Sequence, residues 1–325
     1  MTQSTKQAAQ LPTFVGSLKS GFDLTTRHWW LGILPFLVDL LLWLGPRLNY
    51  QILGERYLDF VVTQAEAPEL SGRFPAVPVE EFSSLLERTN LLSSLSAPFF
   101  GVPILLNGLA QTETPIATQT IFLDSWQALG NNWLIIGLIS MVLSATYLSL
   151  IASVVRDGYV DGADFGRNLL PNIFRLITVT IIAIILLIVI IFPMAFVGGI
   201  VGLLNQGLIF AVAIGGAIVL MWGIILLSFT AQALFLNRLS PLHAMLTSIR
   251  FIRHHLHKAL PLLLSVVLIG SVTDSLWLIA YDGSWLVLVS LAGHAFIATA
   301  LVVATFVFFQ ELTTVNPQEA AQIQA

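Results

Sequence analysis

Long apolar runs alternate with short polar stretches along the chain. A helix that crosses a bilayer needs about 20 mainly apolar residues. Residues 132–155, 259–281 and 284–309 reach that length, while residues 29–45 form the shortest plausible crossing, in which we expect Pro35 to introduce a kink. Residues 176–237 carry no charge and are long enough for two long crossings or three short ones. Two crossings there would give six in all.

Residues 240–260 combine an apolar helical face with a cationic one. Leucine and isoleucine recur at spacings of three and four, which places them on one side of a helix. The other side carries Arg250, Arg253, His254, His257 and Lys258. This pattern is typical of a helix that lies in the membrane interface, so we expect these five side chains to contact the headgroups of membrane lipids. Phe14, Leu18 and Phe22 indicate a second interfacial helix.

One segment, residues 46–131, has the composition of a soluble protein and is interpreted as an insertion outside the bilayer. Glu80 and Glu81 follow Pro78 and predict the first turn of a helix, where the helix dipole favours acidic side chains. The apolar stretch 96–110 is short and is broken by two prolines. We interpret it as a re-entrant or interface-lying piece, with a crossing as the alternative.

The composition agrees with a membrane protein. Hydrophobic residues make up 56% of the 325 residues, charged residues only 10%, and the mean hydropathy is +0.87. A soluble domain is about one-quarter charged, because its surface must be solvated. We therefore expect an all-α, polytopic integral membrane protein, a single membrane domain over residues 1–325 with six transmembrane helices and cytoplasmic interfacial amphipathic helices. The net charge of −4 argues against a nucleic-acid partner.

The distribution of cations predicts the orientation in the cell membrane. With six crossings and 96–110 not crossing, both termini lie on one side, together with ten of the 14 lysines and arginines. Cytoplasmic loops carry the excess of positive charge. We therefore expect cytoplasmic termini and an extracytoplasmic insertion. A crossing at 96–110 would give seven spans and would move two basic connectors to the other side.

One arrangement recurs along the chain: an amphipathic run, a basic or aromatic turn and then a span. It is present in SLKSGFDLTTRHWWLGILPF, in FLDSWQALGNNWLIIGLI and in AMLTSIRFIRHHLHKALPLLL. In this respect the chain resembles a loose group of six-span bacterial membrane proteins that includes the membrane domain of some glycerophosphodiester phosphodiesterases. Ser248-Ile249-Arg250 is similar to an element that precedes the fifth span in that group. The resemblance implies the six-span fold, from which the long insertion departs, and it implies no activity.

Sequence motifs for catalysis and cofactor binding are absent. The chain has no GxxxxGK[ST] loop, HExxH or GxSxG, and it has no cysteine. His254, His255 and His257 would point to different faces of a helix, and no carboxylate is near them in the sequence, so we favour a headgroup-contacting face over a metal site. We expect neither enzymatic activity nor a cofactor.

Three ionisable residues lie inside predicted spans: Asp39, Asp274 and His294. Such residues are costly in lipid and require a protein-lined or hydrated location. A turn at Asp282-Gly283 would place Asp274 opposite Leu291, one helical turn from His294, so the two side chains could pair. The cluster is either a polar contact between helices or a proton- or substrate-contacting pocket, and we favour the contact.

These features predict a non-enzymatic membrane scaffold or accessory protein that organises lipid or a partner complex. The alternative is a small-molecule or lipid transporter that uses the polar cluster, placed by the predicted orientation in the outer half of the membrane.

The topology can be tested with single cysteines, because the natural chain has none. Cysteines introduced at Ser71 and Gln322 are expected to react from opposite sides of the membrane. An impermeant maleimide added to intact cells should label only position 71. Labelling of both positions from outside would contradict the topology.

Overall fold

The computed structural model describes residues 13–65, 79–97, 99–106, 114–204, 206–279 and 283–315. Helices dominate this part of the chain, and its strands are β1 (Arg47–Asn49) and β2 (Thr120–Phe122), which pair in parallel. The predicted all-α polytopic class is confirmed, because the described residues include five helices long and apolar enough to span a membrane and a bent pair that can form a sixth span.

The five long spans comprise α5 (Trp126–Asp157), α6 (Gly162–Leu204), the pair α7 (Gln206–Leu227) and α8 (Thr230–Leu236), α9 (Pro241–Trp277) and α10 (Val287–Val315). Residues 176–237 therefore form two long crossings rather than three short ones. The first helix ends at Leu204 and the second begins at Gln206, in the Asn205-Gln206-Gly207 stretch of the sequence.

The bent pair consists of α1 (Phe14–Arg27) and a second arm that contains η1 (Trp29–Gly32) and α2 (Ile33–Leu44). The two arms meet at 92°, and His28 between them has non-helical backbone angles. The expected kink at Pro35 is wrong. Pro35 lies in the first turn of α2, where a proline removes no hydrogen bond that the helix would make.

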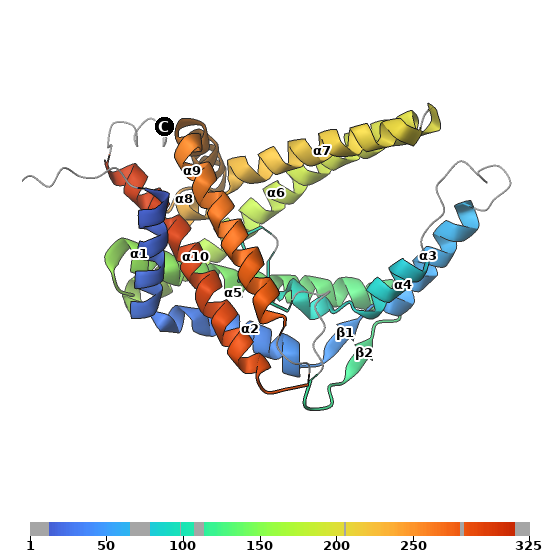
Figure 1. The fold of residues 1–325 in the computed structure, drawn as a ribbon, viewed down its shortest axis with the longest axis horizontal. Coiled ribbons are helices and arrows are strands. Elements are labelled where there is room, and N and C mark those ends of the chain that lie inside the picture. Colours follow the sequence, from blue (N-terminus) through green and yellow to red (C-terminus); the bar gives the residue numbers. More distant parts are fainter. Residues whose placement is uncertain are drawn as a thin grey trace, which may run out of the picture.

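The start of α1, the end of α10 and both connectors of the long helices gather at one end of the bundle (Figure 1). Ser17 donates to Glu311 across α1 and α10 (2.9 Å), and Asp164 pairs with Arg156 and Arg238 from the two connectors. The helices α3 (Gln51–Ala65) and α4 (Val79–Glu87) lie at the opposite end, with both strands and the α6–α7 turn. The described part of the insertion thus begins at one end of the bundle, and the start of α1 and the end of α10 lie at the other. The predicted topology requires this separation.

The insertion contains helices but has no helix or strand where it meets the bundle, over residues 99–106. Glu80 and Glu81 occupy the first turn of α4 as predicted. After η2 (Leu91–Leu95), residues 99–106 contain no helix or strand, yet Val102, Leu105 and Leu106 are buried. This part of the 96–110 stretch therefore enters the protein interior in a non-helical conformation; residues 98 and 107–110 lie outside the described part.

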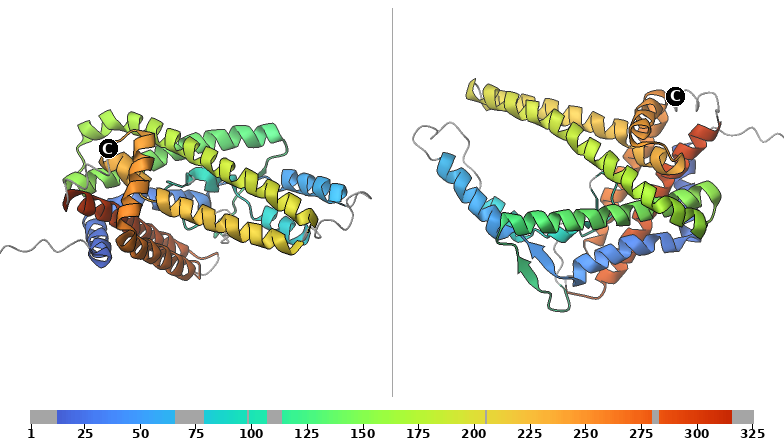
Figure 2. Two further views of the ribbon diagram at one scale, coloured as in Figure 1. Left: turned by 90° about the horizontal axis from the view of Figure 1, so that it is seen from above. Right: turned by 180° about the vertical axis from the view of Figure 1, so that it is seen from behind.

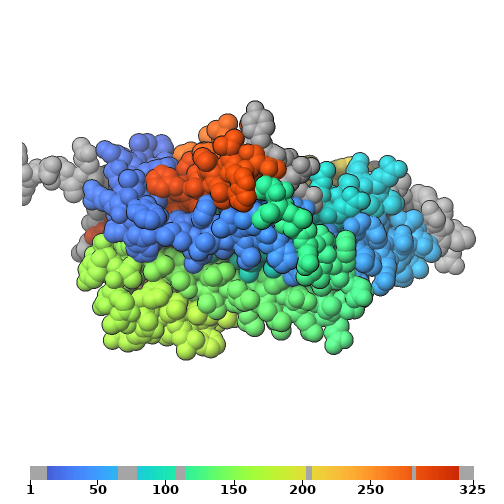
Figure 3. All heavy atoms as spheres, turned by 90° about the horizontal axis from the view of Figure 1, so that it is seen from below, coloured from blue at the N-terminus to red at the C-terminus, as the bar shows by residue number. Residues whose placement is uncertain are grey.

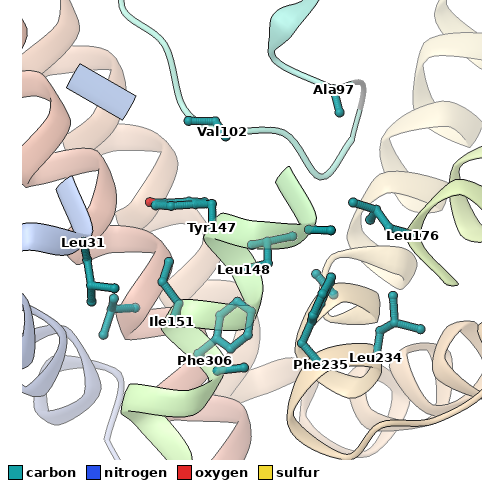
Figure 4. Packing of buried hydrophobic residues seen from close by; sticks show 14 of the residues in the cluster. Leu31, Ala97, Val102, Tyr147, Leu148, Ile151, Leu176, Leu234, Phe235 and Phe306 are labelled. Carbon is teal, nitrogen blue, oxygen red and sulfur yellow. The ribbon is translucent and has the colours of Figure 1, made fainter. Parts of the chain in front are cut away.

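The core is centred on α5 (Figure 4). Leu148 and Ile151 of α5 lie near Phe306 of α10, and Tyr147 points to another side of the helix. Phe235 of α8 and Val102 of the insertion belong to the same buried cluster. The Tyr147 hydroxyl donates to Thr299 of α10 (3.1 Å), which satisfies a polar group that is fully enclosed. Figure 3 shows α2 on the lower surface, between α10 and the α5–α6 pair.

A buried serine stabilises the break between α7 and α8. The Ser248 hydroxyl donates to the Leu226 carbonyl (2.7 Å) and accepts from the Phe229 N–H (3.1 Å). The Phe229 ring packs against Phe251 at 4.8 Å between centroids, and against Phe308 and Phe309. Ser248 of the Ser-Ile-Arg element therefore connects the start of α9 to the preceding span.

The two amphipathic helices bury different kinds of face against protein: α1 buries small residues, whereas α9 also buries large ones such as Phe251 and Ile252. In α1 the buried residues are Ser17, Gly21 and Thr25 rather than the aromatic face, and a Cβ at Gly21 would lie 2.6 Å from Ala304 Cβ of α10. In α9 the non-helical angles of His255 separate the basic amphipathic part from the span. Leu242 and Leu246 of the predicted apolar face stay exposed, as expected if that face meets lipid.

The α6–α7 hairpin diverges from α5 toward the far end of the molecule (Figures 1 and 2). Of the 18-residue windows that define these two spans, only 22% and 6% are buried inside the protein. Within the hairpin the two helices touch closely, since a Cβ at Gly202 would meet Ile209 and one at Gly216 would meet Met194. The hairpin is thus supported mainly by its own internal contact and by its base.

Candidate functional site

The structure brings together the three ionisable residues of the predicted spans. Asp39 comes from α2, Asp274 from the last turn of α9 and His294 from the second turn of α10. His294 Nδ1 lies 2.8 Å from Asp274 Oδ1, which is the contact expected from the register of the hairpin. Asp39 lies on α2, which packs against α10.

Asp39 is completely buried and binds the backbone of the insertion. Its two carboxylate oxygens accept from the Leu105 N–H at 2.9 and 3.0 Å, and one of them also accepts from the Leu106 N–H at 3.0 Å. These residues are not in a helix or strand, so their N–H groups need partners from elsewhere. Asp39 supplies the acceptors, and it thereby ties the insertion to the first span.

Sequence reasoning missed this role of Leu105 and Leu106, because a backbone donor has no side-chain signature. One indirect signal was available. The stretch around Pro103 is apolar but broken by proline, so it cannot satisfy its own amides as a helix does. A buried carboxylate elsewhere in the chain is one of the few groups able to accept from them.

The Asp274–His294 pair differs from Asp39 in its access to the surface. The His294 side chain is 5% exposed, whereas that of Asp274 is 42% exposed. His294 Nε2 is buried and makes no hydrogen bond within the part of the chain that the structure describes. The pair therefore joins an enclosed imidazole to a carboxylate that reaches the surface. Among the described residues there is no cluster of three or more histidine or acidic side chains suited to a metal ion.

The predicted headgroup contacts lie around the kink of α9. Arg250, Arg253 and His254 precede His255, and His257 and Lys258 follow it. Arg253, His254 and His257 are exposed, and Arg250 and Lys258 are half-buried. The first part of α9 lies near the bundle end that also holds the start of α1 and the end of α10 (Figure 1).

Comparison of the chain with protein-family models, with curated proteins and with solved structures finds no match.

The unequal burial of Asp274 and His294 predicts how strongly each of three leucine variants loses stability. Asp274→Leu leaves a buried imidazole without its partner, so we expect it to lower the free energy of unfolding by about 1–3 kcal/mol. His294→Leu leaves a carboxylate that can reach the surface and should cost less. The double leucine variant should be more stable than Asp274→Leu alone, because no polar group is then orphaned. Thermal unfolding in detergent measures all three.

Ser275→Leu is the matched control, since Ser275 neighbours Asp274 on α9 and is exposed. Equal unfolding temperatures for Asp274→Leu and Ser275→Leu would contradict a stabilising pair.

Proposed function

We propose that the protein is a non-enzymatic scaffold or accessory protein of the cell membrane, with both termini cytoplasmic, that organises lipid or a partner complex. The observation that carries this proposal is the α6–α7 hairpin, which extends from the bundle with most of its apolar surface uncovered. The likeness of the amphipathic-helix-then-span units to the membrane domain of some glycerophosphodiester phosphodiesterases stays a proposal about the fold.

The surface of the hairpin is suited to helix–helix association. In lipid, helices associate through close packing of small residues, because apolar side chains gain little by leaving lipid. A Cβ at Gly199 of α6 or Gly215 of α7 would meet nothing within 4 Å. These positions leave room for a helix of another membrane protein to approach closely.

The polar groups inside the bundle support a fixed body rather than a transport path. Asp39 is bound to the insertion, Tyr147 to Thr299, and the Gln232 amide lies 2.8 Å from the Thr305 hydroxyl. Each contact connects two different elements and uses the polar atoms that could otherwise line an aqueous route. A stable bundle with one protruding hairpin gives a partner protein a fixed surface to bind, which suits an accessory role.

A photo-crosslinking amino acid placed in the hairpin tests the proposal in native membranes. Phe192 and Phe210 are suitable positions, because they are 70% and 73% exposed on α6 and α7. Both are expected to form an adduct with the same membrane protein. Leu268 of α9 is the control, being 65% exposed outside the hairpin, and should give lipid adducts only.

Lipid adducts alone at both hairpin positions, or the same protein adduct at Leu268, would contradict the partner-docking role.

The second candidate function is transport of a small molecule or lipid, and it is favoured by the accessible Asp274 beside the enclosed His294. This alternative predicts proton-coupled flux in proteoliposomes, measured with a pH-sensitive dye inside the vesicles. The double leucine variant should fold but lose that flux. Identical proton leakage with and without the two substitutions would exclude this use of the pair.

A further inference from the structure

Two hollows adjoin along the first half of α5. The first has a volume of about 440 Å³ and is lined by residues of α5, η2 and Tyr50. The second has a volume of about 530 Å³ and lies between α5, α6 and the segment that begins with η2. Ser93, Ser94 and Trp133 line both, so the hollows adjoin, and we call the two together the α5 groove.

The first hollow is polar but uncharged. Its lining includes Asn90, Trp126 and Trp133, whose amide and indole side chains carry neutral N–H donors. Asn90 uses its oxygen to accept from the Leu48 and Leu92 N–H groups, which leaves its NH2 group directed to other partners. A lining that offers neutral donors suits carbonyl oxygens such as those of an ester, and it offers no cation to an anionic group.

The second hollow is apolar and has the dimensions of a ligand site, which typically measure about 300–1,000 Å³. Its walls are Leu134, Leu138 and Met141 of α5 and three isoleucines of α6: Ile177, Ile181 and Ile184. Ser140 also lines it, and the Ser140 hydroxyl is buried with no hydrogen-bond partner among the described residues.

Glycine creates part of this space. Gly137 lines the second hollow, and a Cβ at that position would meet nothing within 4 Å. The sequence places Gly137, Ser140 and Ser144 at a spacing typical of close helix packing. Ser140 and Ser144 are buried as that pattern predicts, but Gly137 faces the groove instead of a neighbouring helix.

The position of the groove along α5 matches the structure of a bilayer. The 32 residues of α5 span about 48 Å, which exceeds the hydrocarbon thickness of about 30 Å. Its first two turns carry Trp126 and Trp133, and tryptophan is enriched where membrane meets water. The polar hollow therefore lies at the level of the lipid glycerol, and the apolar hollow, which begins at Leu134, lies at the level of the acyl chains.

We propose that the α5 groove binds one zwitterionic glycerophospholipid from the surrounding bilayer. Its ester carbonyls accept from the neutral donors of the first hollow, and one acyl chain fills the second hollow between α5 and α6. The site does not depend on whether the α6–α7 hairpin docks a partner.

Filling the second hollow tests the proposal. Gly137→Leu adds a side chain where the structure has room, and it should weaken retention of dioleoyl-phosphatidylcholine at least tenfold in native mass spectrometry of the purified full chain. Gly199→Leu is the matched control, because that glycine also has free space around its Cβ and lies outside the groove. The control should bind the lipid as the natural chain does.

A second variant examines the polar end and covers the case in which Gly137→Leu fails to fold. Trp133→Phe keeps an aromatic ring but removes the indole N–H, and it should lower retention several-fold. Unchanged retention in a folded Gly137→Leu or in Trp133→Phe would overturn the proposal, as would tighter retention of dioleoyl-phosphatidylglycerol, which would indicate an anion site. Loss of the hairpin adducts at Phe192 and Phe210 would bear on partner docking alone, because lipid retention is measured on the isolated protein.

Discussion

The bond between the Asp39 carboxylate and the Leu105 and Leu106 N–H groups is the constraint on which the arrangement of the first span and the insertion depends. Non-helical backbone inside an apolar protein leaves donors that cannot reach water, and each unpaired one costs about 1–3 kcal/mol. One fully buried carboxylate serves both amides at 2.9–3.0 Å. The insertion can therefore enter the bundle, where Val102 belongs to the same buried cluster as Tyr147 of α5. Without such an acceptor, a non-helical stretch of this kind is confined to parts of a membrane protein that water reaches.

The same need for hydrogen-bond partners explains why Ser248 lies at the second irregular place in the bundle, the break between α7 and α8. The chain leaves helical geometry between Leu227 and Thr230, and Ser248 bonds both a carbonyl and an amide at that break. The surrounding phenylalanines exclude water, which makes the two bonds obligatory. Asp39 and Ser248 are thus placed to bond irregular backbone, whereas Tyr147 with Thr299 and Gln232 with Thr305 join regular helices. Contacts of these two kinds are the reason a structural role is favoured for most polar residues of the spans. Asp274 with His294 also joins two helices, but its carboxylate reaches the surface.

Much of the architecture could be predicted because it follows from the length of apolar runs. The spans, the turn near Gln206 and the acidic first turn of α4 depend on local pattern alone. The contact of Asp274 with His294 could also be predicted, since a tight hairpin fixes the register of its two arms. The 92° bend at His28 could not, because its direction is determined by the packing of α1 on α10. The predicted kink at Pro35 was wrong because a proline bends a helix only beyond its first turn, and Pro35 lies in the first turn of α2.

The buried faces of the amphipathic helices were harder to predict, because hydrophobicity does not distinguish a lipid-facing side from a protein-facing one. In water the apolar face of a helix turns toward the protein, but beside lipid it can turn outward, and small residues then form the protein contact. Gly21 of α1 is such a contact, with Ala304 of α10 too close for any larger side chain.

Gly137 of α5 is also a glycine on a helix of this bundle, but no helix of the described part of the chain packs against it. The reason is that α6 diverges from α5 toward the far end and leaves the space beside the glycine open. Small residues along a membrane helix therefore specify either a tight contact or a cavity, and only the course of the neighbouring helix decides which. Within a bilayer a cavity open to the side is reached first by lipid. The divergence of the α6–α7 hairpin thus has two effects at once: it uncovers an apolar surface on the hairpin, and it opens a groove along α5.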